Sequence, residues 1–311
     1  MNNLIFQGAV CTDRGNYRKK NEDNFSLGGH SLPREALSGR YTSHTEAEGS
    51  ILCGVFDGVG GEMNGEYASA IGATLLPRYE ASIQKRGAHG IHSYISAANL
   101  DICDLINQCG HSMGTTAALL VASEEGVTAY NIGDSRVYLW RDGKLLQLSK
   151  DHIATDLLIE NGTLTPQEAA TDPRRHHLTQ CIGTSPEEME IQAFESITLL
   201  PKAGDRYLLC SDGVCDPLPG HIIARILGQN LSSDAMAETL VATAMDYGSR
   251  DNCTALVVQV ASSGPSAPRK TASSSQEESR RGIALLVILY LLSCLFTGMI
   301  ANLLLHFFHI L

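Results

Sequence analysis

Hydrophobic and polar positions follow two periods along residues 1–260. Short, mostly apolar runs of four to six residues are typical of strands. They lie at Ile51–Phe56, Val127–Ile132, Val137–Trp140, Tyr207–Cys210 and Ala255–Val260. Apolar residues spaced three and four apart predict helices around residues 91–105 and 236–244.

Local signals predict where some elements turn or begin. Asp142-Gly143, between two strand-like segments, predicts a tight hairpin. Thr165, followed by Pro166 and then Glu168, predicts a helix start. Residues 28–50, rich in Gly, Ser and His, predict a long hairpin loop with His30 and His44 exposed. Because the strands cluster into hairpins, we expect an α+β domain with largely antiparallel sheets.

The last part of the chain has a different composition. Residues 283–311 contain no Asp, Glu, Lys or Arg over 29 positions, whereas about 20 apolar residues span a bilayer. Arg280 and Arg281 precede this stretch, so the positive-inside tendency places the upstream side in the cytoplasm. We therefore expect a domain at 1–260, a Ser- and Pro-rich flexible linker at 261–281, and a single-pass transmembrane tail anchor, one helix, at 282–311.

Charge and cysteine content exclude several classes of protein. The 311 residues carry a net charge of −11, and residues 261–311 hold four basic and two acidic side chains, which leaves −13 on residues 1–260. Such a balance argues against nucleic acid as a partner. The nine cysteines form no CxxC pair, which indicates free thiols in a reducing compartment. None is followed six positions later by Arg, so the loop of cysteine-dependent phosphatases is absent from the sequence.

Acidic residues recur where the strand-like runs end or in turns beside them. They occur in Asn21-Glu22-Asp23-Asn24, Phe56-Asp57-Gly58, Gly133-Asp134-Ser135, Ser211-Asp212-Gly213 and Arg250-Asp251-Asn252. Carboxylates at the ends of neighbouring strands can converge, and they then repel one another unless a cation neutralises them. Mg²⁺ and Mn²⁺ prefer oxygen ligands. Each Asp-Gly pair alone is also an ordinary turn, so the prediction of a metal site rests on all five clusters together.

Eight segments, taken in order, resemble the PP2C-type (PPM) metal-dependent protein serine/threonine phosphatases, and their motif variant is the bacterial one. The resemblance covers about residues 6–260. The segments are TDRGNYRKKNEDNF (12–25), VFDGVGGEMNGEYAS (55–69), GTTAALL (114–120), NIGDSRVYLW (131–140), LSKDH (148–152), PRRHHLTQCIG (173–183), GDRYLLCSDGV (204–214) and SRDNCTALVV (249–258).

The resemblance implies an α-β-β-α sandwich, in which two antiparallel sheets are flanked by helices, and two bound Mn²⁺ or Mg²⁺ ions. Asp57 would bridge the two ions. Glu22 and the Gly58 carbonyl would hold one ion, and Asp212 and Asp251 would hold the other.

Further roles follow from the same resemblance. Asp23 would hold metal-bound waters, and Arg18 would clamp the substrate phosphate. Asp134, with Asp212, would bind a third and weaker ion. Residues 150–186 would form a flap beside the cleft, where we interpret His152, His176 and His177 as packing or substrate-rim residues rather than ligands.

The residue types suit hydrolysis of a phosphate monoester. Two metal ions lower the pKa of a bridging water and neutralise the phosphoryl oxygens, and Arg18 can grip two phosphate oxygens. The chain departs from the family at Val59, where eukaryotic members place a histidine, so no side-chain acid is assigned. It departs again at Glu62, where bacterial members commonly have histidine; a carboxylate there also suits a helix start.

We therefore expect a membrane-tethered enzyme that hydrolyses phosphoserine and phosphothreonine on proteins, among them a serine/threonine kinase or its targets. One alternative is a catalytically weak regulatory module, which would need a broken metal site, although Asp57, Asp212 and Asp251 are present. Another is an enzyme restricted to one partner, such as a phosphorylated anti-sigma-factor antagonist.

Overall fold

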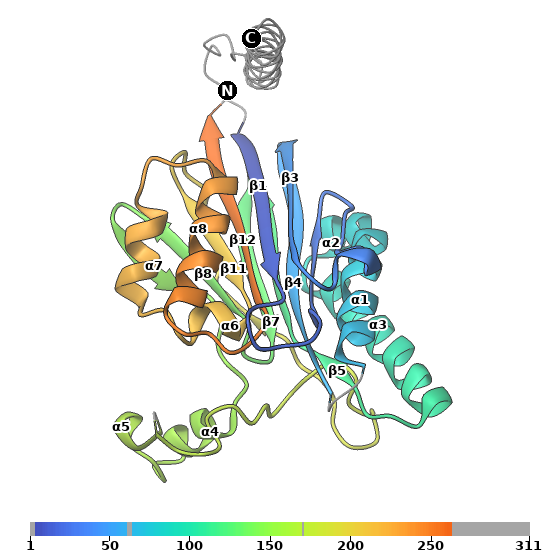
Figure 1. Cartoon of the computed structure of the whole chain (residues 1–311). Coiled ribbons are helices and arrows are strands. Elements are labelled where there is room, and N and C mark those ends of the chain that lie inside the picture. Colours follow the sequence, from blue (N-terminus) through green and yellow to red (C-terminus); the bar gives the residue numbers. More distant parts are fainter. Residues whose placement is uncertain (1–3, 61–63, 170, 263–311) are drawn as a thin grey trace, which may run out of the picture. The chain divides into compact units, whose positions relative to one another are not determined.

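The computed structural model describes residues 4–60, 64–169 and 171–262, and two antiparallel sheets form its centre (Figure 1). The first sheet has six strands in the order β3-β1-β12-β11-β8-β9. Their bounds are β1 Leu4–Asp13, β3 Arg40–Glu48, β8 Arg136–Arg141, β9 Lys144–Gln147, β11 Arg206–Cys210 and β12 Cys253–Ser262.

The second sheet has the order β10-β7-β6-β4-β2, and β5 pairs with β4 beside this path. Its strands are β2 Asp23–Leu27, β4 Ser50–Val59, β5 Gly114–Thr115, β6 Ala117–Ser123, β7 Gly126–Ile132 and β10 Phe194–Glu195. All of these pairings are antiparallel.

Helices cover the outer face of each sheet (Figure 1). One group packs on the second sheet: α1 Gly65–Leu75, η2 Leu76–Tyr79, α2 Glu80–Arg86 and α3 Ala88–Cys109. The other packs on the first sheet: α6 Asp212–Cys215, α7 Gly220–Leu227 and α8 Ser233–Asp246. The short elements η1 Arg34–Ala36, α4 Ala154–Glu160 and α5 Pro166–Ala169 lie in connecting segments. The predicted α-β-β-α sandwich is confirmed.

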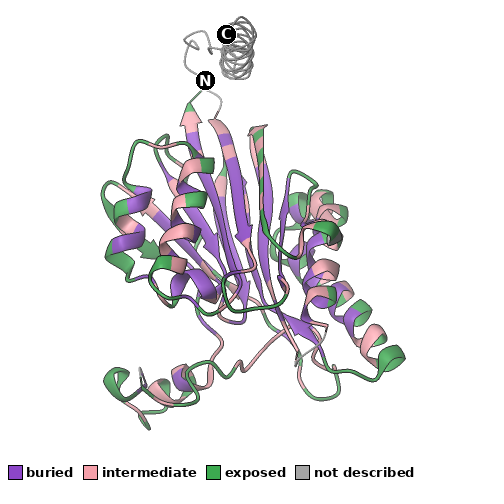
Figure 2. Cartoon of the chain, viewed as in Figure 1, coloured by how far each residue is buried: buried purple, intermediate pink, exposed green. Residues whose placement is uncertain are grey.

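The central strands are largely apolar because they bury both faces, as Figure 2 shows in purple. Tyr207 and Leu209 on β11 join the core between the sheets, whereas Leu208 and Cys210 join the core under α6–α8. On β6, Leu120 faces the central core and Leu119 packs under α1–α3. The buried side chains therefore form three apolar layers, one between the sheets and one under each group of helices. Each large side chain that is fully buried contributes roughly 1.5–3 kcal/mol to the folding free energy.

Two predicted local features are confirmed. Asp142 and Gly143 adopt φ of +51° and +78° and join β8 to β9, as the positive φ values of a two-residue hairpin require. The Thr165 hydroxyl accepts from the Glu168 amide at 3.3 Å, and the Glu168 carboxylate accepts from the Thr165 amide at 2.8 Å, which is a reciprocal cap on α5.

The predicted long loop at residues 28–50 is wrong in its second half. Residues 40–48 form β3, which pairs with β1 along its length. Tyr41, Ser43, Thr45 and Ala47 alternate with more exposed neighbours, so the strand has a period of two but little hydrophobic contrast. His30 and His44 are exposed, as expected.

The predicted tail anchor at 282–311 lies outside the described residues. So does the predicted linker at 261–281, apart from residues 261 and 262, which belong to β12. In the described part of the chain, no helix is both long and apolar enough to cross a bilayer.

Candidate metal centre

Most of the predicted site residues line one cleft at the seam between the two sheets. The cleft measures about 1170 Å³, and its lining includes Arg18, Glu22, Asp57, Gly58, Asp134, Asp212 and Asp251. The second sheet supplies Asp57 on β4 and Glu22 just before β2, whereas Asp212 and Asp251 adjoin β11 and β12 of the first sheet. The structure therefore brings together carboxylates that are up to 229 positions apart in the sequence, from Glu22 to Asp251.

Asp57 is held in β4 by pairing with β2 and by hydrogen bonds to two threonines. It lies opposite Asp23 in the β2–β4 register. Its amide donates to the Thr116 hydroxyl at 3.0 Å, and its carbonyl accepts from the Thr115 hydroxyl at 3.0 Å. The Thr116 hydroxyl in turn bonds Ser135 at 2.7 Å. These contacts fix the backbone that carries the central carboxylate.

Three residues from different parts of the chain hold the backbone of Glu22. Its amide donates to the Asn252 side chain at 2.8 Å. Its carbonyl accepts from the Ser69 hydroxyl at 2.6 Å and from the Gly58 amide at 3.1 Å. Gly58 itself must lack a side chain, because a Cβ there would collide with the carbonyl of Gly65 at the start of α1. The Asp-Gly pair thus allows β4 and α1 to approach closely beside Glu22.

Asp23 is the most deeply buried carboxylate of the group, with 1% of its surface exposed. Its Oδ2 accepts from the hydroxyls of Ser211 at 2.7 Å and Thr254 at 2.6 Å, while its Oδ1 is buried without a partner among the described residues. Burial raises the pKa of Asp23 to about 7, although the two hydroxyl bonds oppose the rise. Asp23 therefore ties the second sheet to the first directly behind the cleft.

The remaining carboxylates are also hard to ionise together. Desolvation raises the pKa of Asp134 to about 8 and that of Asp212 to about 6, and neighbouring carboxylates add to both shifts. The pKa of Asp57 is raised well above its usual range by burial and then by Asp23 and Asp212. In addition, Asp212 Oδ1 is buried and has no hydrogen-bond partner within the described ranges. A bound cation would offset the repulsion and satisfy such oxygens.

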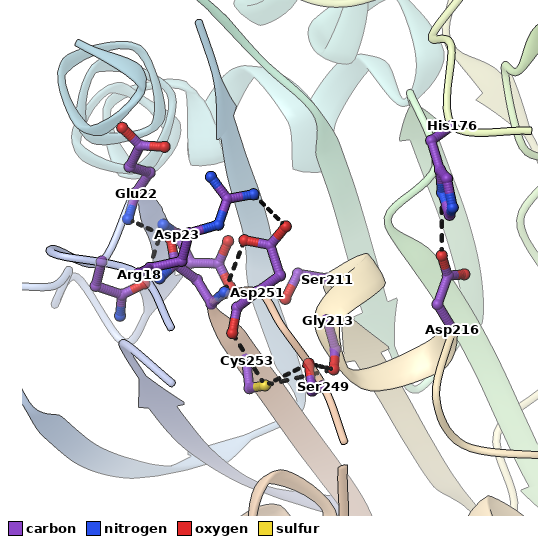
Figure 3. Close-up of polar contacts among 12 residues, drawn as sticks. Arg18, Glu22, Asp23, His176, Ser211, Gly213, Asp216, Ser249, Asp251 and Cys253 are labelled. Atoms are coloured by element: carbon purple, nitrogen blue, oxygen red, sulfur yellow. Dashed lines mark hydrogen bonds and ion pairs between the residues drawn. The ribbon is translucent and has the colours of Figure 1, made fainter. Parts of the chain in front are cut away.

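Arg18 lies in the cleft and pairs with a predicted metal ligand. Its Nη2 is 2.5 Å from Asp251 Oδ2, and about half of its side chain is exposed. Figure 3 shows the guanidinium reaching across to Asp251, with Glu22 on its other side. Arg18 is thus placed to bind an anion that enters the cleft. At the rim, the Arg250 guanidinium lies over the Tyr17 ring at 6.0 Å.

The flap segment supplies a histidine that the sequence interpretation did not count as a ligand. His176, Asp212 and Asp216 offer ligand atoms that all lie within 4.8 Å of one another. His176 Nδ1 is 3.3 Å from Asp216 Oδ2, and the two face each other in Figure 3. Asp216 lies four residues after Asp212, one helical turn away, which is a signal that the sequence did contain. His152 differs, since its Nδ1 accepts from the Gly133 amide at 3.3 Å.

Other residues around the centre were also missed from sequence. Asn252, Ser211 and Thr254 position Glu22 and Asp23 through the bonds described above, and all three are buried polar residues. Glu66 on α1 forms an ion pair with Lys20 next to Glu22. Glu62 lies outside the described residues, and the first described residue of that turn is Asn64, which occupies the N-cap position of α1 without a side-chain capping bond.

Comparison with known proteins identifies the family. Residues 39–244 match the family model described as "Protein phosphatase 2C". The chain belongs to the protein phosphatase 2C family. The matched residues include β4, β7, β8 and β11 and three of the cleft residues, Asp57, Asp134 and Asp212.

Bacterial proteins are among those similar to this chain. The serine/threonine protein phosphatase PstP of Mycobacterium tuberculosis is 30% identical over 270 residues, which are 83% of this chain and 45% of PstP. The chain thus matches less than half the length of that relative. A crystal structure of M. tuberculosis PstP has a TM-score of 0.67 and 28% identity, covering 82% of this chain and 98% of that one.

A second structure bears on the metal. The catalytic domain of PstP, crystallised in complex with two manganese ions, has a TM-score of 0.64 and 27% identity over 83% of this chain and 99% of that domain.

Proposed function

We propose that this protein is a metal-dependent protein phosphatase that hydrolyses phosphoserine and phosphothreonine. The observation that carries the proposal is the convergence of Glu22, Asp57, Asp134, Asp212 and Asp251 in one cleft that Arg18 also lines. Membership of the protein phosphatase 2C family supports it.

The residues present fit two Mn²⁺ or Mg²⁺ ions. Asp57 lies centrally, where it would serve both ions; Glu22 and the Gly58 carbonyl would complete one site, and Asp212 and Asp251 the other. The buried, unpartnered Oδ1 of Asp212 and the raised pKa values of the cluster are what such ions would relieve. When bound, the ions supply positive charge for a phosphate dianion and lower the pKa of an attacking water.

The protein's own groups bind and orient the substrate. Arg18 would exchange its contact with Asp251 for two oxygens of the phosphate, because a guanidinium binds such oxygens as a planar fork. Val59 lines the cleft at the position without a side-chain acid, so the chain offers no general acid there. Asp134 and Asp212 would hold a third, weaker ion, and His176 and Asp216 lie beside that pair.

The enzymatic proposal is tested with the purified full chain and a phosphothreonine peptide. We expect release of inorganic phosphate with Mn²⁺ and none after chelation. Asp57→Asn should abolish turnover while the far-ultraviolet circular dichroism is unchanged, and Asp101→Asn on the exposed side of α3 serves as the control. Wild-type protein that releases no phosphate with any divalent ion would refute the proposal.

We also propose that residues 282–311 anchor the domain on the cytoplasmic side of a membrane, near a serine/threonine kinase or its targets. The uncharged stretch and the preceding Arg280 and Arg281 support this. Removal of residues 282–311 should transfer the protein from the membrane fraction to the soluble fraction. An unchanged distribution between the fractions would contradict the anchor.

A further inference from the structure

The ion pair of Lys20 and Glu66 lies beside the Glu22 side of the centre. Lys20 belongs to the loop before β2, and Glu66 to the first turn of α1. Lys20 Nζ contacts Glu66 Oε1, and the Glu66 side chain is only 11% exposed. Its second oxygen, Oε2, is buried and has no hydrogen-bond partner among the residues that the structure describes. One oxygen of this buried carboxylate is therefore paired with Lys20, and the other has no partner among the described residues.

Glu22 packs against the same turn of α1. A Cβ built on Gly65 would lie 3.3 Å from Cδ of Glu22, so the carboxyl group of Glu22 rests on the residue next to Glu66. The Ser69 hydroxyl joins the two, since it donates to the carbonyls of Glu22 at 2.6 Å and of Glu66 at 3.3 Å.

We propose that Glu66 and Lys20 are a positioning pair, which orients Glu22 and sets the net charge beside it, and so tunes the cation affinity of the Glu22 side of the centre. This inference rests on the proposed function. Groups that contact the ligands of a metal typically change metal affinity by 10–100-fold when they are removed. The leftover Oε2 is suited to accept a hydrogen bond from the hydration shell of a cation held by Glu22. Lys20 limits the negative charge that Glu66 adds.

Substituting Glu66 and substituting Lys20 should change the Mn²⁺ affinity in opposite directions. Glu66→Gln removes a negative charge beside Glu22, so this variant should bind Mn²⁺ 10–100-fold more weakly. Lys20→Met removes the opposing positive charge and leaves Glu66 free to face Glu22, so it should bind Mn²⁺ several-fold more tightly. Lys19→Met is the matched control, because Lys19 is an exposed neighbour and its removal changes the net charge equally.

The measurement is calorimetric titration of the metal-stripped full chain, in detergent, with Mn²⁺. A merely structural ion pair would give another result: both variants break the same contact, so both would lower the affinity or neither would change it. That result, or a Lys19→Met variant that binds as tightly as Lys20→Met, would overturn the inference.

Double variants test whether Glu66 acts through Glu22. Glu66→Gln added to Glu22→Gln should cause no further loss of affinity, because the route through Glu22 is already removed, whereas added to Asp251→Asn it should cause its full loss. Equal losses in both backgrounds would overturn the inference. Wild-type protein that binds no Mn²⁺ would overturn the proposed function as well. Wild-type binding with an unaffected Glu66→Gln variant would overturn this inference alone.

Discussion

Asp134→Asn should stabilise the metal-free protein, and increasingly so as the pH rises. Asp134 has an ordinary pKa of 3.8, which rises to about 8 in the fold. In the unfolded chain it loses its proton near pH 4, whereas in the folded protein it keeps the proton to about pH 8. Because the folded state binds more protons in this window, stability falls as the pH rises from about 4 to about 8.

The size of the effect follows from the shift. A shift of about four pKa units corresponds to at most about 5–6 kcal/mol at about 1.36 kcal/mol per unit. Neighbouring carboxylates relax when one of them stays neutral, so we expect about half of this, ~3 kcal/mol, at pH 8 and only about 1 kcal/mol at pH 5. With saturating Mn²⁺ the order should reverse, because the wild type gains more from binding.

The assay is urea unfolding of the chelator-treated full chain in detergent at pH 5 and pH 8. Trp140, the single tryptophan, lies on β8 under the Arg206 guanidinium at 4.8 Å and reports on the first sheet by fluorescence. Asp101→Asn on the exposed face of α3 is the control. An equal difference between Asp134→Asn and wild type at both pH values would refute a raised pKa of Asp134 in the fold.

Three further predictions concern the neighbourhood of the centre. His176→Ala should weaken binding of the lowest-affinity Mn²⁺ ion while His177→Ala does not, as measured by titration; equal affinities would remove the flap histidine from the site. Thr254→Val should lower the free energy of unfolding by about 1–3 kcal/mol, since it deletes a buried bond to Asp23; a denaturant midpoint like that of the wild type would contradict this. Gly58→Ala should abolish turnover or folding, because its Cβ collides with Gly65; an active and stable variant would show that β4 and α1 can separate.

The sequence was sufficient for the elements that have strong local contrast. Tyr207–Cys210 is continuously apolar because alternate residues enter different cores, and this appears as a short apolar run. β3 was missed because Ser43 and Thr45 give its inner face almost no hydrophobic contrast, and its position is decided by pairing with β1, a non-local interaction.

The residues of the metal centre show the same contrast between local signals and non-local contacts. Acidic residues in turns beside strands were visible from sequence, and the resemblance to a family assigned them to one cleft. The partners of these residues were not visible, because Thr254 and Asn252 reach Asp23 and Glu22 across more than 200 positions. A buried Thr or Asn has the same local pattern whether it fills a turn or supports a carboxylate. Only the three-dimensional arrangement separates these roles.

The placement of the centre at the seam has a consequence for how the protein assembles. Glu22 and Asp57 come with one sheet, and Asp212 and Asp251 come with the other. Neither sheet alone contains the full set of proposed ligands, so a chain that has formed one sheet but not docked the other would have little affinity for the cation. Cation binding would therefore stabilise only molecules whose two sheets have docked in the correct alignment. A partly folded chain would gain no such stabilisation and no hydrolytic activity.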